Sequence, residues 1–172
     1  MNKPSLIILE GTDKSGKSTT AILLSKKIKN SVLIHGNIRP YDNSEKERKK
    51  VKDYYRNILK ILRIFKDKTI ILDRYYPSQM IYSIKREKDE FKDIWYKNLE
   101  KDILKTNHLF IYVRPLEESI IKRLKREGDE YVDEQDIKIL IKRYDNFYKN
   151  TKLNKIKITS SDDEKLKKIW ST

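Results

Sequence analysis

The sequence predicts an α/β domain in which helices cover both faces of a parallel sheet of five strands. Short apolar runs, typical of strands buried on both faces, recur along the chain. They alternate with longer charged segments whose apolar residues repeat at helical spacing. No internal repeat or low-complexity linker interrupts the alternation, so residues 1–172 are expected to form a single domain.

The expected strands are the apolar runs themselves. They cover residues 6–9, 32–34, 69–72, 108–113 and 155–158. Because connections between parallel strands need a crossover, a helix is expected in each interval. Ligands of such sheets bind beyond the carboxyl ends of the strands, so functional residues are expected there.

The expected helices follow from apolar spacing. The segment 44–66, for example, places Val51, Tyr55 and Ile58 on one side. The full set is 17–29, 44–66, one or two helices over 78–86 and 90–105, and then 116–126 and 134–150. A last helix is expected to run to Trp170, with Ser161 or Asp162 as its N-cap.

The composition is strongly charged and contains no cysteine, which excludes disulfides and thiolate metal sites. No apolar run approaches a membrane span and no signal-peptide pattern is present, so we expect no membrane contact and a cytoplasmic location. The 40 basic and 26 acidic residues leave a net charge of +14, which suggests an anionic substrate or a nucleic acid. The lysines are spread over many segments, which favours diffuse charge over a dedicated nucleic-acid face.

A phosphate-binding motif follows the first strand. Residues 11–18 read Gly-Thr-Asp-Lys-Ser-Gly-Lys-Ser and match the G-x-x-x-x-G-K-[ST] pattern of a P-loop, which by itself fits many NTPases. Its backbone N–H groups and the positive end of the next helix face a phosphate. Lys17 is expected to bridge the β- and γ-phosphates of ATP, and the Ser18 hydroxyl to ligate Mg²⁺. The expected ATP-binding residues are Gly11, Thr12, Asp13, Lys14, Ser15, Gly16, Lys17, Ser18 and Thr19.

A second set of candidates follows the third strand. Asp73 ends this strand, where an acid can act beside the metal ion, although many turns also begin with aspartate. Arg74 beside it can hold a phosphate through two parallel hydrogen bonds. His35 and His108 lie at strand borders without ligand-spaced partners and are expected to be structural.

Together these motifs resemble the thymidylate kinase family of nucleoside monophosphate kinases, and the resemblance implies a P-loop kinase fold. Residues 9–13, Leu-Glu-Gly-Thr-Asp, with Gly-Lys-Ser-Thr at 16–19, look like the family's phosphate loop. Asp-Arg-Tyr-Tyr-Pro-Ser at 73–78 resembles its D-R-Y-x-x-S segment. The resemblance implies transfer of a phosphoryl group from ATP, with Mg²⁺, to a deoxynucleoside monophosphate, most simply dTMP. It also implies a homodimer.

The resemblance implies roles for matching residues. Asp13 would contact the 3′-OH of the acceptor sugar. Asp73 would act with Mg²⁺ and the acceptor phosphate, which Arg74 would clamp. Gln79 falls where the family bonds the base, and Tyr82 where a ring packs against C2′ and disfavours ribose. A solvated position for Gln79 and a core position for Tyr82 are the structural alternatives.

Further acceptor contacts are implied outside this segment. Arg39 lies in the loop after the second strand, where the family carries a phosphate-binding arginine. Tyr54 or Tyr55 would stack on the base and Arg56 would donate to a base carbonyl. Core packing is an equal alternative for the two tyrosines. Ser78 completes the acceptor set.

A short lid is expected over residues 123–133. Arg123 and Arg126 would neutralise charge on the transferring phosphoryl group, with Lys14 of the phosphate loop as a second source of that charge. A solvent-exposed basic helix face is the structural alternative. Residues 159–162 are expected to lie against the adenine.

Two other functions stay open. A P-loop kinase acting on a hydroxyl of a polynucleotide or a modified base in DNA fits the positive charge and the short segment before Asp73, which would then be a general base. A protein that only binds nucleotide or nucleic acid would also keep the loop. Intact Lys17, Ser18 and Asp73 argue against this second reading.

Overall fold

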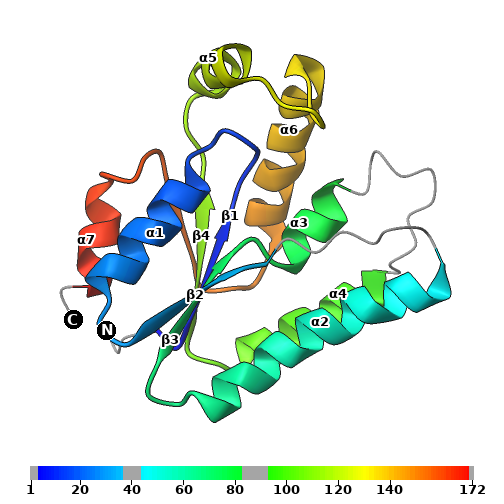
Figure 1. Ribbon diagram of the computed structural model, residues 1–172, viewed down its shortest axis with the longest axis vertical. Helices are drawn as coiled ribbons and strands as arrows, with labels where there is room; N and C mark the ends of the chain where they lie inside the picture. Colours follow the sequence, from blue (N-terminus) through cyan, green and yellow to red (C-terminus); the bar gives the residue numbers. More distant parts are fainter. Residues whose placement is uncertain (1–3, 37–43, 83–92, 171–172) are drawn as a thin grey trace.

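The computed structural model describes residues 4–36, 44–82 and 93–170, and it shows a twisted parallel sheet between two layers of helices (Figure 1). The strands are β1 (Leu6–Glu10), β2 (Ser31–His35), β3 (Thr69–Asp73), β4 (His108–Val113) and β5 (Lys155–Ile158). They are all parallel, in the order β2-β3-β1-β4-β5. The predicted fold class and all of the predicted strands are confirmed.

The helices also follow the sequence pattern. They are α1 (Lys17–Lys27), α2 (Glu45–Ile64), α3 (Tyr76–Ile81), α4 (Asp93–Leu104), α5 (Glu117–Glu127), α6 (Glu134–Asn150) and α7 (Glu164–Trp170). The expected start of α3 at Ser78 is wrong by two residues, because Pro77 stands in the first turn, where its missing N–H needs no partner. Residues 83–86 of that expected helix, and residues 90–92 at the expected start of the next one, lie outside the described part of the chain.

The expected N-caps of the last helix are also wrong. Asp163, not Ser161 or Asp162, accepts the backbone N–H of Lys165 at 3.1 Å. The other oxygen of Asp163 accepts the N–H of Thr159 at 3.2 Å, so one carboxylate closes the loop and begins the helix.

The hydrophobic core lies on both faces of the sheet, as alternation along the strands requires. On β1, Leu6 and Ile8 join the cluster beneath α2, α3, α4 and α6, while Ile7 and Leu9 pack with α1 and α7. Figure 1 shows α1 and α7 together on one side of the sheet and the other packed helices opposite. None of the helices in the described residues is long and apolar enough to cross a bilayer.

The order of the strands determines where the candidate site lies. β1 and β3 are hydrogen-bonded neighbours in the middle of the sheet, with Leu9 paired to Asp73. The carboxyl ends of these two strands carry the phosphate loop and the Asp73–Arg74 segment. Two motifs about 60 residues apart therefore meet at one edge of the sheet.

Candidate active site

The phosphate loop has the backbone that its glycines permit. Gly11 has a φ of +155°, and a Cβ there would lie 2.6 Å from the Val113 carbonyl oxygen, so no side chain fits. Gly16, with a φ of +89°, precedes the first residue of α1. Lys14 also adopts a positive φ of 59°, which is uncommon for a residue with a Cβ.

Lys17 is buried at the base of this loop. Its Nζ donates to the Thr12 carbonyl at 3.2 Å and lies 4.0 Å from the Asp13 carboxylate. Burial lowers the pKa of Lys17 to about 8, and the Arg74 charge adds to this effect. The carboxylates of Asp13, Asp73 and Glu10 oppose the shift. The lysine is therefore still mostly charged at neutral pH, and a bound polyphosphate would raise its pKa again by favouring the charged form.

This shift predicts a pH dependence of ATP binding. Because bound phosphate favours the charged lysine, ATP affinity is expected to fall as pH rises through about 8. The limiting slope is about tenfold per pH unit, as for one linked proton. Calorimetry in buffers of different ionisation enthalpy would show proton uptake on binding near pH 9. Lys17→Arg, whose side chain stays charged, is expected to lose the dependence, and a flat wild-type profile would contradict the shift.

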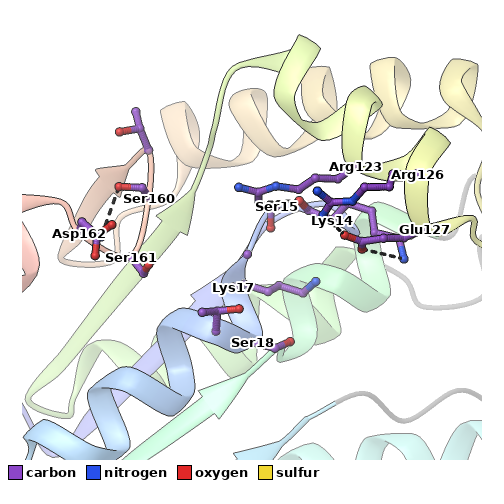
Figure 2. A pocket seen from close by; sticks show the side chains of 13 residues that line it. Lys14, Ser15, Lys17, Ser18, Arg123, Arg126, Glu127, Ser160, Ser161 and Asp162 are labelled. Atoms are coloured by element: carbon purple, nitrogen blue, oxygen red, sulfur yellow. Dashed lines mark hydrogen bonds and ion pairs between the residues drawn. The ribbon is translucent and has the colours of Figure 1, made fainter.

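A pocket of about 540 Å³ opens over the loop. Figure 2 shows Arg123, Arg126 and Glu127 gathered on one side of it, and the segment 159–162 opposite. The structure thus brings the phosphate loop, the expected lid segment and the expected adenine segment together. The loop residues in the lining are Lys14, Ser15, Gly16, Lys17, Ser18 and Thr19.

The lid rests on the loop through Lys14. One terminal nitrogen of Arg123 donates to the Lys14 carbonyl at 3.2 Å. The Lys14 Nζ lies 3.6 Å from a Glu127 oxygen and 3.9 Å from an Asp129 oxygen. Arg126 instead pairs with Glu127 at 2.5 Å. Glu127 and Asp129 were not among the predicted site residues, because the sequence pattern of this segment drew attention to its arginines.

Arg74 lies at the centre of a buried polar network and is 6% exposed. One terminal nitrogen donates to the Gly11 carbonyl at 3.3 Å, to the Ser78 hydroxyl at 3.0 Å and to the Tyr144 hydroxyl at 3.3 Å. The other donates to Asp13 at 2.5 Å and to the Tyr82 hydroxyl at 3.3 Å. Both terminal nitrogens are therefore bonded to protein oxygens.

Glu10, the last residue of β1, is the second charge of this network and is fully buried. One oxygen accepts the backbone N–H of Tyr75 at 2.7 Å and that of Ser78 at 3.3 Å. The other accepts the hydroxyls of Ser78 at 2.6 Å and Tyr144 at 3.0 Å. Burial raises the pKa of Glu10, and the Arg74 charge and these hydrogen bonds oppose the rise.

Glu10 and Tyr144 were not among the predicted site residues. The apolar run before Glu10 identifies a strand but not the partner of its last side chain. Tyr144 falls at a core position of α6, where a tyrosine looks like ordinary packing. Both are recognisable only from the contacts that the fold creates.

Asp73 is 5% exposed at the end of β3. Its Oδ2 lies 3.2 Å from Nδ1 of His35, so His35 touches the candidate catalytic acid, which the sequence did not predict. Its Oδ1 is buried and has no hydrogen-bond partner in the described part of the chain.

This unpartnered oxygen fits a magnesium ligand. Mg²⁺ in such sites takes one or two carboxylates and substrate phosphates rather than an all-protein cage. No group of three His, Cys, Asp or Glu side chains suited to a metal occurs within the described ranges, so the ion would depend on the nucleotide's own oxygens. Ser18, exposed at the start of α1, supplies the expected hydroxyl.

The predicted base-contacting residues of α2 differ in burial: Tyr55 lies in the core, whereas Tyr54 and Arg56 are more accessible. Tyr55 is 1% exposed and packs against Tyr75 and Trp95, so it occupies a core position, as the structural alternative expected. Tyr54 is half-buried, and its hydroxyl donates to the His35 carbonyl at 3.1 Å. Arg56 is exposed on α2, 3.8 Å from Asp53.

The other acceptor candidates lie closer to the phosphate loop. The Tyr82 hydroxyl donates to Asp13 at 2.7 Å and accepts the backbone N–H of Asp13 at 3.2 Å. Ser78 and Gln79 are buried in α3, so Gln79 is not a solvated helix residue. Arg39 lies outside the described residues.

Comparisons with known proteins identify one sequence relative and several structures of similar fold. No family model matches the chain. The SPβ prophage-derived uncharacterised protein YorR of Bacillus subtilis strain 168 is 27% identical over 152 residues, which cover 87% of this chain and 86% of YorR. The crystal structure of YorR in complex with phosphorylated GDP has a TM-score of 0.76 at 26% identity, covering 95% of this chain and 92% of that one.

More distant structures share the fold. Deoxyadenosine kinase from M. mycoides with bound dATP has a TM-score of 0.62 at 22% identity and covers 95% of each chain. Thymidylate kinase from Candida albicans has a TM-score of 0.58 at 20% identity, covering 98% of this chain and 90% of that one. The chain therefore shares the fold of these P-loop nucleotide kinases.

Proposed function

We propose that this protein transfers the terminal phosphoryl group of ATP to a deoxynucleoside monophosphate, with dTMP as the first candidate acceptor. One observation carries the proposal. Asp13 of the phosphate loop is hydrogen-bonded to both Arg74 and Tyr82, which belong to the segment 73–82 that is expected to bind the acceptor. Donor and acceptor elements thus form one hydrogen-bonded unit, as a two-substrate kinase requires.

The chemistry follows from these parts. The loop N–H groups and Lys17 hold the ATP phosphates, and Mg²⁺ on Ser18 and Asp73 would neutralise charge on the phosphates. An acceptor phosphate oxygen is already anionic and attacks without a strong base. Arg123 is placed to offset charge on the transferred group, and the lid excludes water. Catalysis is then mainly alignment and charge neutralisation.

Within this proposal, Arg74 acts as an organiser of the site. The resemblance implies a phosphate clamp, but a clamp needs N–H groups that point at the ligand. Here the terminal nitrogens face Asp13, Ser78 and other protein oxygens. We propose that Arg74 holds Asp13 and Tyr82 in place beside the acceptor sugar.

A panel of acceptors tests the proposal. Protein, labelled ATP and Mg²⁺ would be incubated with dTMP, the other deoxynucleoside monophosphates, ribonucleoside monophosphates and oligonucleotides. Guanine nucleotides belong in the panel because YorR was crystallised with phosphorylated GDP. Diphosphate formed from dTMP or a few deoxynucleotides supports the proposal. Label on oligonucleotides without monophosphate turnover would overturn it.

One observation favours the second candidate, a kinase acting on a hydroxyl of a polynucleotide or of a modified base in DNA. A hydroxyl must lose a proton, and a buried carboxylate with an unpartnered oxygen, such as Asp73, suits a general base. The oligonucleotide arm of the panel tests it. Binding of that oligonucleotide that falls steeply with salt would also show that the +14 charge is a binding surface.

The homodimer implied by the resemblance stays a prediction. Light scattering of the free protein, with and without ATP, would test it.

The lid geometry predicts unequal roles for its arginines. Arg123 touches the loop, whereas Arg126 is engaged by Glu127. Arg123→Met is therefore expected to lower kcat by about 10²-fold, with a much smaller loss for Arg126→Met. Lys125→Met, on the same helix and paired with Glu134, is the matched control. Equal losses for the two arginine variants would show that Arg126 moves onto the phosphate in the bound state.

A further inference from the structure

We propose that His35 is a positioning residue for phosphoryl transfer. Its Nδ1–H donates to Oδ2 of Asp73 and thereby directs Oδ1 toward the reacting phosphates. The inference rests on the proposed function, because it assigns Asp73 to the reaction. It adds a residue that the phosphate loop and the D-R-Y-x-x-S segment do not contain.

The sheet itself brings the two side chains together. His35 and Asp73 are direct partners in the parallel ladder between β2 and β3. Residues paired in this way send their side chains to the same face of the sheet. The resulting separation of Nδ1 and Oδ2 is 3.2 Å.

The backbone of His35 is held although its ring is not buried. Its carbonyl accepts the Tyr54 hydroxyl at 3.1 Å, and the next N–H, that of Gly36, donates to the Asp73 carbonyl at 2.9 Å. A Cβ at Gly36 would lie 1.9 Å from the Arg74 carbonyl oxygen, so only glycine allows β2 to stay this close to β3. The histidine side chain itself is 66% exposed.

The hydrogen bond from His35 matters because Oδ1 of Asp73 has no partner, within the ranges that the structure describes, that would fix its orientation. The last torsion of an aspartate is broad and nearly two-fold, so a carboxylate with no hydrogen bond can rotate. In the described residues, the bond from His35 is the one hydrogen bond to the Asp73 carboxylate, and Oδ1 has none. An error of about 1 Å in a reacting group can cost about 10² in rate. Fixing Oδ2 therefore also fixes the buried Oδ1, the oxygen that this proposal assigns to the reacting phosphates.

The exposure of the ring makes the inference testable apart from folding. A mostly exposed side chain contributes little to the core, so substitution of His35 should leave the thermal midpoint of unfolding nearly unchanged. A kinetic defect in a folded variant would then report positioning. Asparagine is the conservative variant, because its side-chain N–H₂ can replace the Nδ1–H donor.

The kinetic experiment compares His35→Ala with His35→Asn. We expect the alanine variant to lower kcat by about 10- to 100-fold with little change in the KM for ATP, and the asparagine variant to recover most of the loss. In an Asp73→Asn background the alanine substitution should have almost no further effect, since both act through one group. An alanine variant within about twofold of wild type overturns the proposal. So does an asparagine variant as defective as alanine.

A second measurement needs no catalysis. The chain has only two histidines, so ¹⁵N spectra of labelled imidazoles, recorded well above neutral pH, resolve both rings. The proposal requires the Nδ1–H tautomer at His35 and its loss in Asp73→Ala. His108 is the internal control, because Nδ1 lies 2.9 Å from the Thr106 carbonyl and Nε2 accepts the N–H of Asn154 at 3.0 Å.

The kinetic and spectroscopic measurements distinguish a failure of the His35–Asp73 contact from a failure of the proposed function. The Nε2–H tautomer at His35 in the wild type overturns the positioning contact, even if the protein proves to be a kinase. The Nδ1–H tautomer in a protein that phosphorylates no acceptor overturns the proposed function, and the catalytic part of this inference with it.

Discussion

Replacement of Asp73 by asparagine is expected to lower phosphoryl transfer by about 10³-fold while ATP affinity changes only a few-fold. Asparagine keeps the shape and buried position of the side chain but removes the negative charge. The Asp73 carboxylate, with one oxygen held by His35 and the other unpartnered, is the candidate group for the metal ion and the acceptor. The loop that binds most of the ATP is left intact.

The measurement is kcat with the best acceptor of the panel, alongside calorimetric ATP affinity for the same variant. Asp67→Asn, the same chemical change at an exposed position just before β3, is the control and should be neutral. A near-normal rate for Asp73→Asn would remove Asp73 from the mechanism. Parallel loss of rate and ATP affinity would instead show that the residue serves nucleotide binding.

Replacement of Arg74 by methionine is expected to lower the free energy of unfolding by about 3–5 kcal/mol. The substitution removes the Arg74 charge that opposes the fully buried Glu10 carboxylate, and it removes the hydrogen bond from Arg74 to Asp13. Removing one partner of a buried ionic network costs far more than an exposed ion pair contributes. A simple phosphate clamp would instead lose acceptor affinity and keep its stability.

Denaturant unfolding at neutral pH measures this loss. The exposed Arg56→Met, which breaks the 3.8 Å pair with Asp53, is the control and should change stability by no more than about 1 kcal/mol. The double variant Glu10→Gln with Arg74→Met should recover part of the stability, because it removes the stranded charge. A stability of Arg74→Met equal to wild type would contradict the structural role.

The same variant should have a distinctive pH profile. Burial already raises the pKa of Glu10, and removal of Arg74 takes away a positive charge that opposes this rise. The folded variant would then hold a proton on Glu10 that the unfolded chain releases above its ordinary pKa of 4.5. Its stability is therefore expected to be greatest at acid pH and to fall as pH rises.

The sequence by itself determined the parts of this protein that are encoded locally. The phosphate loop could be predicted because glycines at 11 and 16 and the lysine at 17 specify a backbone shape and its ligand within eight residues. The strands could be predicted because buried parallel strands leave continuous apolar runs. Asp73 stood out because it ends such a run.

Tertiary structure alone decided which side chains share the site. Glu10 and Tyr144 are 134 positions apart and meet only because α6 packs over the end of β1. His35 contacts Asp73 because β2 pairs with β3 in a register that places these two residues opposite each other. Tyr55 lies in the core rather than at the pocket because of the face of α2 that it occupies. Contacts between residues far apart in the chain leave no local pattern, so only the packed fold reveals them.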